Sequence, residues 1–297
     1  MKRSFLSRLR SNGLSYLFGA LLLLAGIPAY QTFVLVPLGY NNALTATTAG
    51  NIAAYLAWIG GHTFPFLLYR VLLLFAFVLL LSLPFTLFRV IVAQELMGQE
   101  EREAEELAED DESDVEEDEE DEEDIETAEG MPPYAWRGKG FAVIAAWSGL
   151  IGLIVYIIGT LGSILTLATS SNGVTSSTAL SGGSILLLSI FAIVTNTVGI
   201  GFLALSTLFF GAIIARSGGK LWPTVWVIFG YIAFGVAALF SGSAVSVASA
   251  PTSGQAPLTA PAILLFGVWV LWLAVMLVRL KPEPVSVGTD LSRPLGD

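Results

Sequence analysis

Uncharged apolar stretches alternate with short polar segments along this chain, and six of these stretches are long enough to cross a bilayer. A hydrocarbon layer of about 30 Å requires about 20 apolar residues in a helix, and the run from Leu14 to Val36 has no charged residue. The pattern predicts an all-α polytopic membrane protein with six transmembrane helices arranged as three hairpins. The predicted helices cover residues 14–36, 66–92, 141–168, 185–215, 221–240 and 262–278.

These helices divide the chain into four regions: an N-terminal membrane hairpin (residues 1–94), an acidic loop (95–140), a four-helix membrane region (141–281) and a short tail (282–297). The stretch 44–61 is only moderately apolar and ends with paired glycines, so we interpret it as an interfacial or re-entrant helix. Counting it as a seventh span would place cationic segments on both sides of the membrane, against the usual charge asymmetry.

The cationic residues lie on one side of the predicted bundle. Of the 14 Lys and Arg residues, 13 fall on that side, and Arg70 is the exception. Because Lys and Arg accumulate in cytoplasmic segments, this distribution predicts a multi-pass plasma membrane protein with both termini in the cytoplasm. Composition agrees with an environment of lipid, since 54% of the residues are hydrophobic and 13% are charged.

The net charge of -11 comes from one segment, because 22 of the 25 Asp and Glu residues lie between Glu95 and Glu129. Such a block cannot bury enough apolar surface to fold alone, which predicts a long, disordered, acidic cytoplasmic loop between the second and third helices. Three interpretations stay open: a solvated tether, a binding site for a basic cytoplasmic protein partner, and a loose cation-binding segment. The acidity is also compatible with a salt-adapted (halophile) source.

The predicted spans lack the side chains that do chemistry within a bilayer. None contains Asp, Glu, Lys, His or Cys, and the whole chain has no Cys and a single histidine, His62. Hydrolases and proton-coupled carriers need such groups in the membrane. We therefore expect no catalytic residue, no metal site, no cofactor and no nucleic-acid partner, and we predict that the protein is not an enzyme.

Arg70 and Arg89 are separated by 18 uncharged residues in the second predicted helix. At 1.5 Å per residue they lie about 28 Å apart, close to the thickness of the hydrocarbon layer. Arg70 could therefore extend to the outer headgroups beside Tyr69. The alternative is a role in a pore or ligand site, because an intramembrane arginine is a functional candidate.

Three further features mark helix packing or a transport path. Asn196 lies near the middle of the fourth helix, followed by Gly199 and Gly201, and a buried amide there needs a partner. It could bond to a neighbouring helix or mark an opened helix that lines a path. Trp269 and Trp272 share one face of the sixth helix, where they could form packed core or line a ligand site.

The third helix carries a row of small residues that predicts close helix packing: Gly149, Gly152, Gly159 and Gly162. Two functions remain. The first is a non-enzymatic interaction or assembly component that presents the acidic loop to a partner. The alternative is a permease or channel subunit for an uncharged or partner-driven solute, with a path near Arg70, Asn196, Gly199, Gly201 and Trp272.

Overall fold

The fold is known from a computed structural model that describes residues 3–48, 50–95, 139–175, 180–217, 223–249 and 258–280. These ranges contain helices and turns and no β-strand. Six helices are long and apolar enough to cross a membrane, which confirms the prediction of an all-α polytopic membrane protein. The spans are Ser7–Leu35, Thr63–Glu95, Gly140–Ser170, Gly182–Arg216, Thr224–Ser249 and Thr259–Val278.

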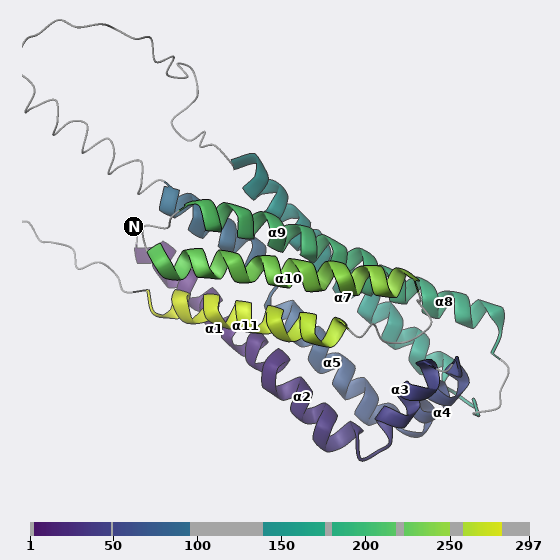
Figure 1. The fold of residues 1–297 in the computed structure, drawn as a ribbon. Helices are drawn as coiled ribbons and strands as arrows, with labels where there is room; N and C mark the ends of the chain where they lie inside the picture. The colour runs from purple at the N-terminus through teal and green to yellow at the C-terminus, as the bar shows by residue number, and fades with distance from the viewer. Residues whose placement is uncertain are drawn as a thin grey trace, which may run out of the picture.

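Several spans are built from more than one helical segment, and Figure 1 shows their arrangement. The α-helices are α1 (Arg3–Leu21), α2 (Ile27–Tyr30), α3 (Tyr40–Thr48), α4 (Ile52–Gly61), α5 (Thr63–Leu79), α7 (Lys139–Ser170), α8 (Gly182–Ile193), α9 (Ile200–Ser217), α10 (Pro223–Ser249) and α11 (Thr259–Val278). Residues 83–95 form a further helical segment. The π-helical segments are η1 (Leu22–Gly26), η2 (Gln31–Leu35) and η3 (Val194–Gly199).

Pro28 explains the composite first span. It lacks the amide hydrogen that a regular helix would direct to the carbonyl four residues earlier. The α-helical pattern is interrupted on both sides of it, because η1 precedes α2 and η2 follows it. Gly39 then reverses the chain towards α3 with a φ of 87°, a conformation that favours glycine.

Pro84 interrupts the second span, which the sequence pattern predicted as one continuous helix. The segment 80–82 forms turns, and the amide of Leu83 donates to the oxygen of Leu80 (2.9 Å) instead of continuing the α-helical pattern. The hydroxyl of Ser15 on α1 donates to the Leu79 oxygen (3.2 Å). Another helix thus satisfies a carbonyl that the break leaves without its helical partner.

A buried polar network ties α1 to this break. The hydroxyl of Tyr16 lies 2.6 Å from Thr86 Oγ1 and 2.8 Å from Ser82 Oγ, and the Asn12 amide donates to Thr86 Oγ1 (2.9 Å). Tyr16 is fully buried. Polar groups away from water need such partners, so these side chains fix how α1 packs beside the second span.

The stretch 44–61 does not cross the bundle. It belongs to two short helices, α3 and α4, which lie together at one end of the molecule (Figure 1). Gly50, with a φ of 84°, lies between them, and the Asn51 side chain caps α4 by accepting a bond from the Ala54 amide (3.0 Å). We call this end of the bundle the distal end.

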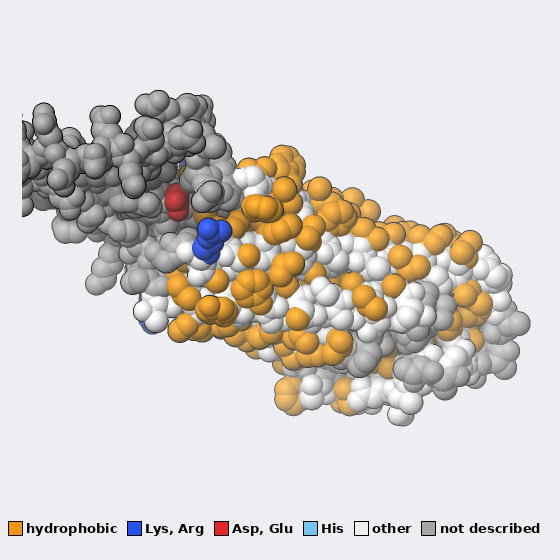
Figure 2. Space-filling view, turned by 45° about the horizontal axis from the view of Figure 1, so that its top comes forward, with side chains coloured by type: hydrophobic (Ala, Val, Ile, Leu, Met, Phe, Trp, Pro, Cys, Tyr) orange, Lys and Arg blue, Asp and Glu red, His pale blue; other side chains and the backbone are white. Residues whose placement is uncertain are grey.

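The opposite end, which we call the charged end, carries most of the charged side chains of the described residues (Figure 2). They are Arg8, Arg10, Arg89, Glu95, Arg216 and Arg279. Arg10 is held there by a bond from its Nε to the oxygen of Leu280 (2.8 Å). The grouping of the spans into three hairpins stays a prediction.

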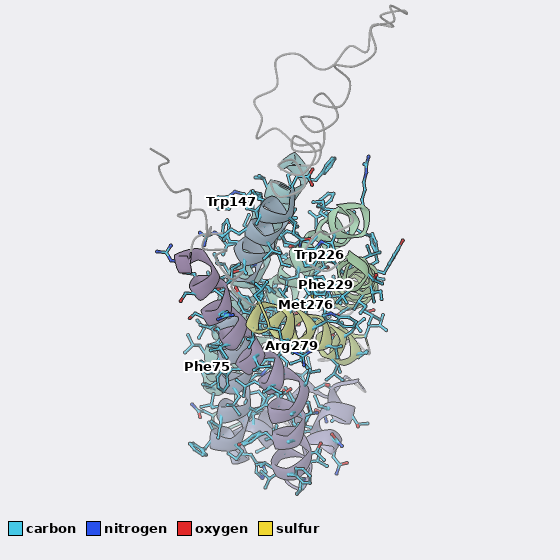
Figure 3. All side chains as sticks on the ribbon, turned by 90° about the vertical axis from the view of Figure 1, so that its left-hand side faces the viewer. Phe75, Trp147, Trp226, Phe229, Met276 and Arg279 are labelled. Atoms are coloured by element: carbon cyan, nitrogen blue, oxygen red, sulfur yellow. The ribbon has the colours of Figure 1, made fainter. Side chains whose placement is uncertain are left out.

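The surface between the two ends is apolar, as contact with lipid requires. Hydrophobic side chains cover the face in Figure 2, and Figure 3 places Phe75 and Trp147 on the outside of the bundle. Phe75 is 52% exposed and Trp147 is 54% exposed. The main core contains Trp226, Phe229 and Met276 between the helices, and a smaller core at the distal end packs α3 and α4 against the spans.

The glycines of α7 lie at close helix contacts, which confirms the predicted packing face. A Cβ on Gly152 would lie 2.9 Å from the Leu203 nitrogen on α9, and one on Gly149 would lie 2.6 Å from Ser206 Oγ. Gly159 faces Thr195 on η3, and Gly162 faces the ring of Phe191 on α8. Small residues therefore bring α7 against the whole length of the fourth span.

Two further predictions differ from the structure or lie outside it. The fifth helix continues to Ser249 rather than ending near residue 240, and the hydroxyl of Ser246 donates to the Gly242 oxygen (2.7 Å), so this serine-rich turn satisfies its own polar groups. The acidic segment after Glu95 and the tail 282–297 lie outside the described residues.

Candidate functional site

A cavity of about 100 Å³ lies at the distal end, between the short helices and three of the spans. Polar and apolar side chains both line it. The polar set is Thr47, Tyr55, Arg70, Thr160, Ser163, Thr195 and Asn196, and the apolar set is Ile52, Leu167, Leu188, Phe191 and Ala192. Arg70 and Asn196, two residues of the predicted path, therefore share one cavity, which the other three residues of that path do not line.

Arg70 lines this cavity from α5, and its side chain is half-buried. Its guanidinium carbon lies 5.3 Å from the centroid of the Phe66 ring, which provides a cation–π contact. Its Nε is inaccessible to solvent and has no hydrogen-bond partner. Arg70 thus lines the cavity, and the choice between anchoring and a ligand role stays a prediction.

Tyrosine hydroxyls surround the guanidinium in place of carboxylates. Four tyrosines lie close enough to interact with it electrostatically: Tyr40, Tyr55, Tyr69 and Tyr156. Glu95 is the one acidic side chain in the described residues, and it lies at the charged end of the same span. The positive charge of Arg70 therefore has no negative counterpart within the described part of the bundle.

Tyr40 and Tyr55, on α3 and α4, stay in their protonated form at neutral pH. Burial raises the pKa of Tyr40 well above its usual value, and burial also raises the pKa of Tyr55 although Arg70 opposes that shift. A neutral phenol keeps its proton available for donation. Tyr55, which lines the cavity, can therefore donate a hydrogen bond to a bound group.

Asn196 lies in the π-helical segment η3, near the middle of its span. Such segments are rare and occur frequently at functional sites. Asn196 lines the cavity, while Thr197 ties η3 to α10 by a hydrogen bond to the Ala244 oxygen (3.2 Å). Thr195 also lines the cavity, and its Oγ1 is buried without a partner.

Gly199 and Gly201 follow Asn196 but do not line the cavity. Gly199 is buried against α7, where a Cβ would lie 3.0 Å from the Tyr156 nitrogen. Gly201 has open space around it, because a Cβ there would meet no atom within 4 Å. Of these two glycines, only Gly199 lies at a close helix contact.

Trp269 and Trp272 lie away from the Arg70 cavity. Trp269 is buried in the main core, where its indole donates to the Phe229 oxygen (3.1 Å) and stacks on the Phe229 ring at 4.8 Å. Phe229 stacks in turn on Trp226. Trp272 is partly buried and packs against the same core. The two tryptophans are part of the helix packing.

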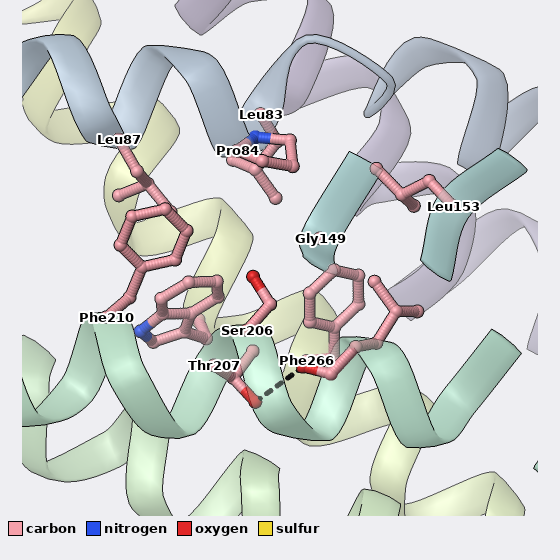
Figure 4. Close-up of a pocket in the computed structure, with 11 residues that line it drawn as sticks. Leu83, Pro84, Leu87, Gly149, Leu153, Ser206, Thr207, Phe210 and Phe266 are labelled. Atoms are coloured by element: carbon pink, nitrogen blue, oxygen red, sulfur yellow. Dashed lines mark hydrogen bonds between the residues drawn. The ribbon is translucent and has the colours of Figure 1, made fainter. Parts of the chain in front are cut away.

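A second cavity lies beside Trp269 and Pro84, and Figure 4 shows its lining. Its volume is about 10 Å³, the space of a single water molecule. The polar groups in its wall are satisfied locally: Ser206 donates to the Ala145 oxygen (2.7 Å) and Thr207 to the Leu203 oxygen (2.9 Å). This cavity is a packing feature too small for a solute.

The sequence pattern did not single out Tyr55, Thr160 or Thr195, and it placed Ser163 only on the packing face of the third helix. A signal was available, because Thr160 and Ser163 adjoin the packing glycines Gly159 and Gly162 on α7. Polar residues beside a packing face point into the bundle. Across the described ranges, no three His, Cys, Asp or Glu side chains gather as a metal site would need.

Comparisons with known proteins give no information about this site. No protein-family model, no curated protein and no solved structure matches this chain.

Proposed function

We propose that this chain is a non-enzymatic integral membrane protein that binds a polar solute between its helices, as a permease or as the membrane subunit of one. The observation that carries the proposal is the shared cavity of Arg70 and Asn196. Solute sites in membrane bundles are concave, have a few convergent polar groups and adjoin irregular helix segments. The distal cavity has these three properties.

The irregular segment η3 supports a transport role. A π-helical turn weakens the regular hydrogen-bond pattern, and membrane transporters bind their substrates where helices are discontinuous. Asn196 presents an amide to the cavity from this segment near the middle of the span. A polar group at this depth provides a binding position for a solute between the distal end and the middle of the membrane.

The non-enzymatic part of the proposal rests on the lack of reactive groups in the spans. The charged residues of the second span are Arg70, Arg89 and, at its end, Glu95. Hydroxyl and amide groups supply the other polar side chains that line the distal cavity. Binding and passage need only such groups. We place the protein in the plasma membrane with both termini in the cytoplasm, because cationic residues gather at the charged end.

The experiment is flux into proteoliposomes, with three probes of nearly equal size and different charge: 2-hydroxybutyrate, 2-hydroxybutanamide and 1-amino-2-butanol. At least one should enter faster than into protein-free liposomes, and Asn196→Leu should reduce that flux several-fold. Gly201→Ala, in open space on the same span, is the matched control and should keep it. If no probe enters above background and none binds, the solute proposal is wrong.

A second candidate function is the interaction or assembly component, and one observation favours it. The segment from Glu95 to Glu129 contains 22 of the 25 acidic residues, which suits a basic cytoplasmic partner. Crosslinking in membranes followed by identification of the bound chains tests this function. A nucleotide-hydrolysing partner would support a transport assembly, and recovery of this chain alone would count against both kinds of complex.

A further inference from the structure

We infer that the ligand of the distal cavity carries a compact anionic group, a carboxylate or a phosphate, and that Arg70 binds it. The inference rests on the proposed solute binding and names the class of solute. It follows from three features of the cavity: an uncompensated cation, further hydrogen-bond donors in its wall, and apolar side chains that complete the wall.

The charge of Arg70 is the first feature. The Arg70 side chain is half-buried and its Nε is inaccessible to solvent. Taking part of a guanidinium out of water is costly unless a negative group lies nearby, because attraction between charges strengthens as the dielectric constant falls. The surrounding tyrosine hydroxyls are neutral, and the described spans offer no carboxylate near Arg70. An anionic ligand against the accessible part of the Arg70 side chain would supply the missing charge.

The other arginines show what a structural role looks like in this protein. Arg89, on the same span, has an exposed side chain at the charged end. Arg10 donates from its Nε to the Leu280 oxygen. Arg70 has neither the exposure of Arg89 nor the acceptor of Arg10 for its Nε. Anchoring to headgroups therefore accounts for Arg89 but not for the position of Arg70 in the cavity wall.

The neighbouring side chains can donate hydrogen bonds to the same anion. Tyr55 contributes a hydroxyl and Asn196 an amide, and both line the cavity with Arg70. Carboxylate and phosphate oxygens only accept hydrogen bonds when ionised, so this donor-rich wall fits them better than it fits an ammonium group.

The rest of the cavity limits the size of the ligand. Leu188 and Phe191 on α8, with Ile52 and Leu167, form an apolar wall. At about 100 Å³, the space is smaller than the cavity of about 150 Å³ that holds a benzene molecule in another protein. A short acyl group fits this space. The anion could thus belong to a soluble short-chain acid or to the headgroup of an anionic lipid.

The test is thermal unfolding of the purified protein in phosphatidylcholine nanodiscs, titrated with the same three probes. We expect 2-hydroxybutyrate to raise Tm in a saturable way, with an affinity at least about tenfold above those of the amide and the amine. Arg70→Gln should weaken 2-hydroxybutyrate binding by about tenfold or more and leave the amide unaffected. Arg89→Gln is the matched control and should bind all three probes as the wild type does.

A second bilayer containing phosphatidylglycerol separates the two sources of the anion. If the headgroup is the ligand, this lipid raises Tm of the wild type and of Arg89→Gln but not of Arg70→Gln, and 2-hydroxybutyrate adds nothing. If a soluble acid is the ligand, 2-hydroxybutyrate acts equally in both bilayers. Both results support an anion site.

Two results would overturn the inference, and one of them would also contradict the proposed solute binding. Equal affinity of the wild type for the acid and the amide means that charge is not recognised, although solute binding would stand. No shift with any probe or with the anionic lipid removes both the anion site and the solute proposal. The three titrations of the wild-type protein decide these points even where Arg70→Gln fails to fold. The variant Arg70→Lys keeps the positive charge and should retain part of the preference for the acid over the amide.

Discussion

Gly199 lies directly against the backbone of Tyr156, so that a Cβ at position 199 would come within 3.0 Å of the Tyr156 nitrogen and 3.2 Å of its Cα. Backbone atoms in the middle of a packed helix cannot move aside independently. The contact joins the end of η3 to α7, one helical turn below the cavity residue Asn196. The identity of residue 199 therefore controls how closely the two helices can approach.

Gly199→Ala should lower the stability of the bundle by about 1–3 kcal/mol, the usual cost of overfilling a packed contact. Gly201→Ala should leave stability unchanged or raise it, because a methyl group there meets open space and alanine favours helix formation. Thermal unfolding of both variants in detergent compares them directly. Equal melting temperatures for the two variants would contradict the close contact.

Tyr16→Phe should destabilise the protein by about 1 kcal/mol, the scale of interhelical hydrogen bonds in membranes. The substitution removes the hydroxyl that meets Ser82 and Thr86 at the break in the second span. Tyr231→Phe provides the matched control, since Tyr231 is 63% exposed on the apolar surface. A melting temperature of Tyr16→Phe that matches the control would show that the network does not stabilise the fold.

Single cysteines should reveal which end of the bundle faces the cytoplasm. The chain contains no cysteine, so labelling has no background. We expect an impermeant thiol reagent to label Ser249→Cys in intact cells and to spare Ser7→Cys and Ser113→Cys until the membrane is opened. The reverse pattern would invert the predicted orientation while leaving the six spans in place.

Deletion of residues 110–124 should leave insertion and melting temperature of the bundle nearly unchanged. The deleted block is almost entirely acidic and cannot contribute a packed core. Membrane fractionation and thermal unfolding measure the two properties, and pull-down of cytoplasmic proteins measures what the block does instead. A variant that fails to insert or unfolds early would show that the segment is structural.

The positions of the spans could be predicted from sequence because a helix in lipid must satisfy its own backbone and cover itself with apolar side chains. Their ends were harder to place. Ser246 looked like part of a loop, yet its hydroxyl bonds back to Gly242 and lets α10 continue. The sequence pattern missed the break before Pro84, and the Tyr16 network that completes the break depends on a helix far away in the chain.

The site could be predicted only in part, for a physical reason. Arg70 and Asn196 are unusual residues for a membrane span, and the sequence placed both near one predicted path, together with Gly199, Gly201 and Trp272, which do not line the cavity. Whether an arginine turns to the headgroups or to the interior depends on the faces of the neighbouring helices. The short helices α3 and α4, which supply Thr47, Ile52 and Tyr55, close the cavity from outside the spans, and no periodic pattern relates them to Arg70.

The π-helical segment η3 has a consequence for how this cavity changes with sequence. A π-turn contains about one residue more than an α-turn, and each residue of an α-helix corresponds to a rotation of about 100°. The surplus residue in η3 therefore sets the rotational phase of α8 relative to α9. Leu188, Phe191 and Ala192 face the cavity because of that phase. Loss of one residue from η3 would present a different face of α8 to the cavity, and so a different wall to the solute, with every polar group on α5 and α7 still in place.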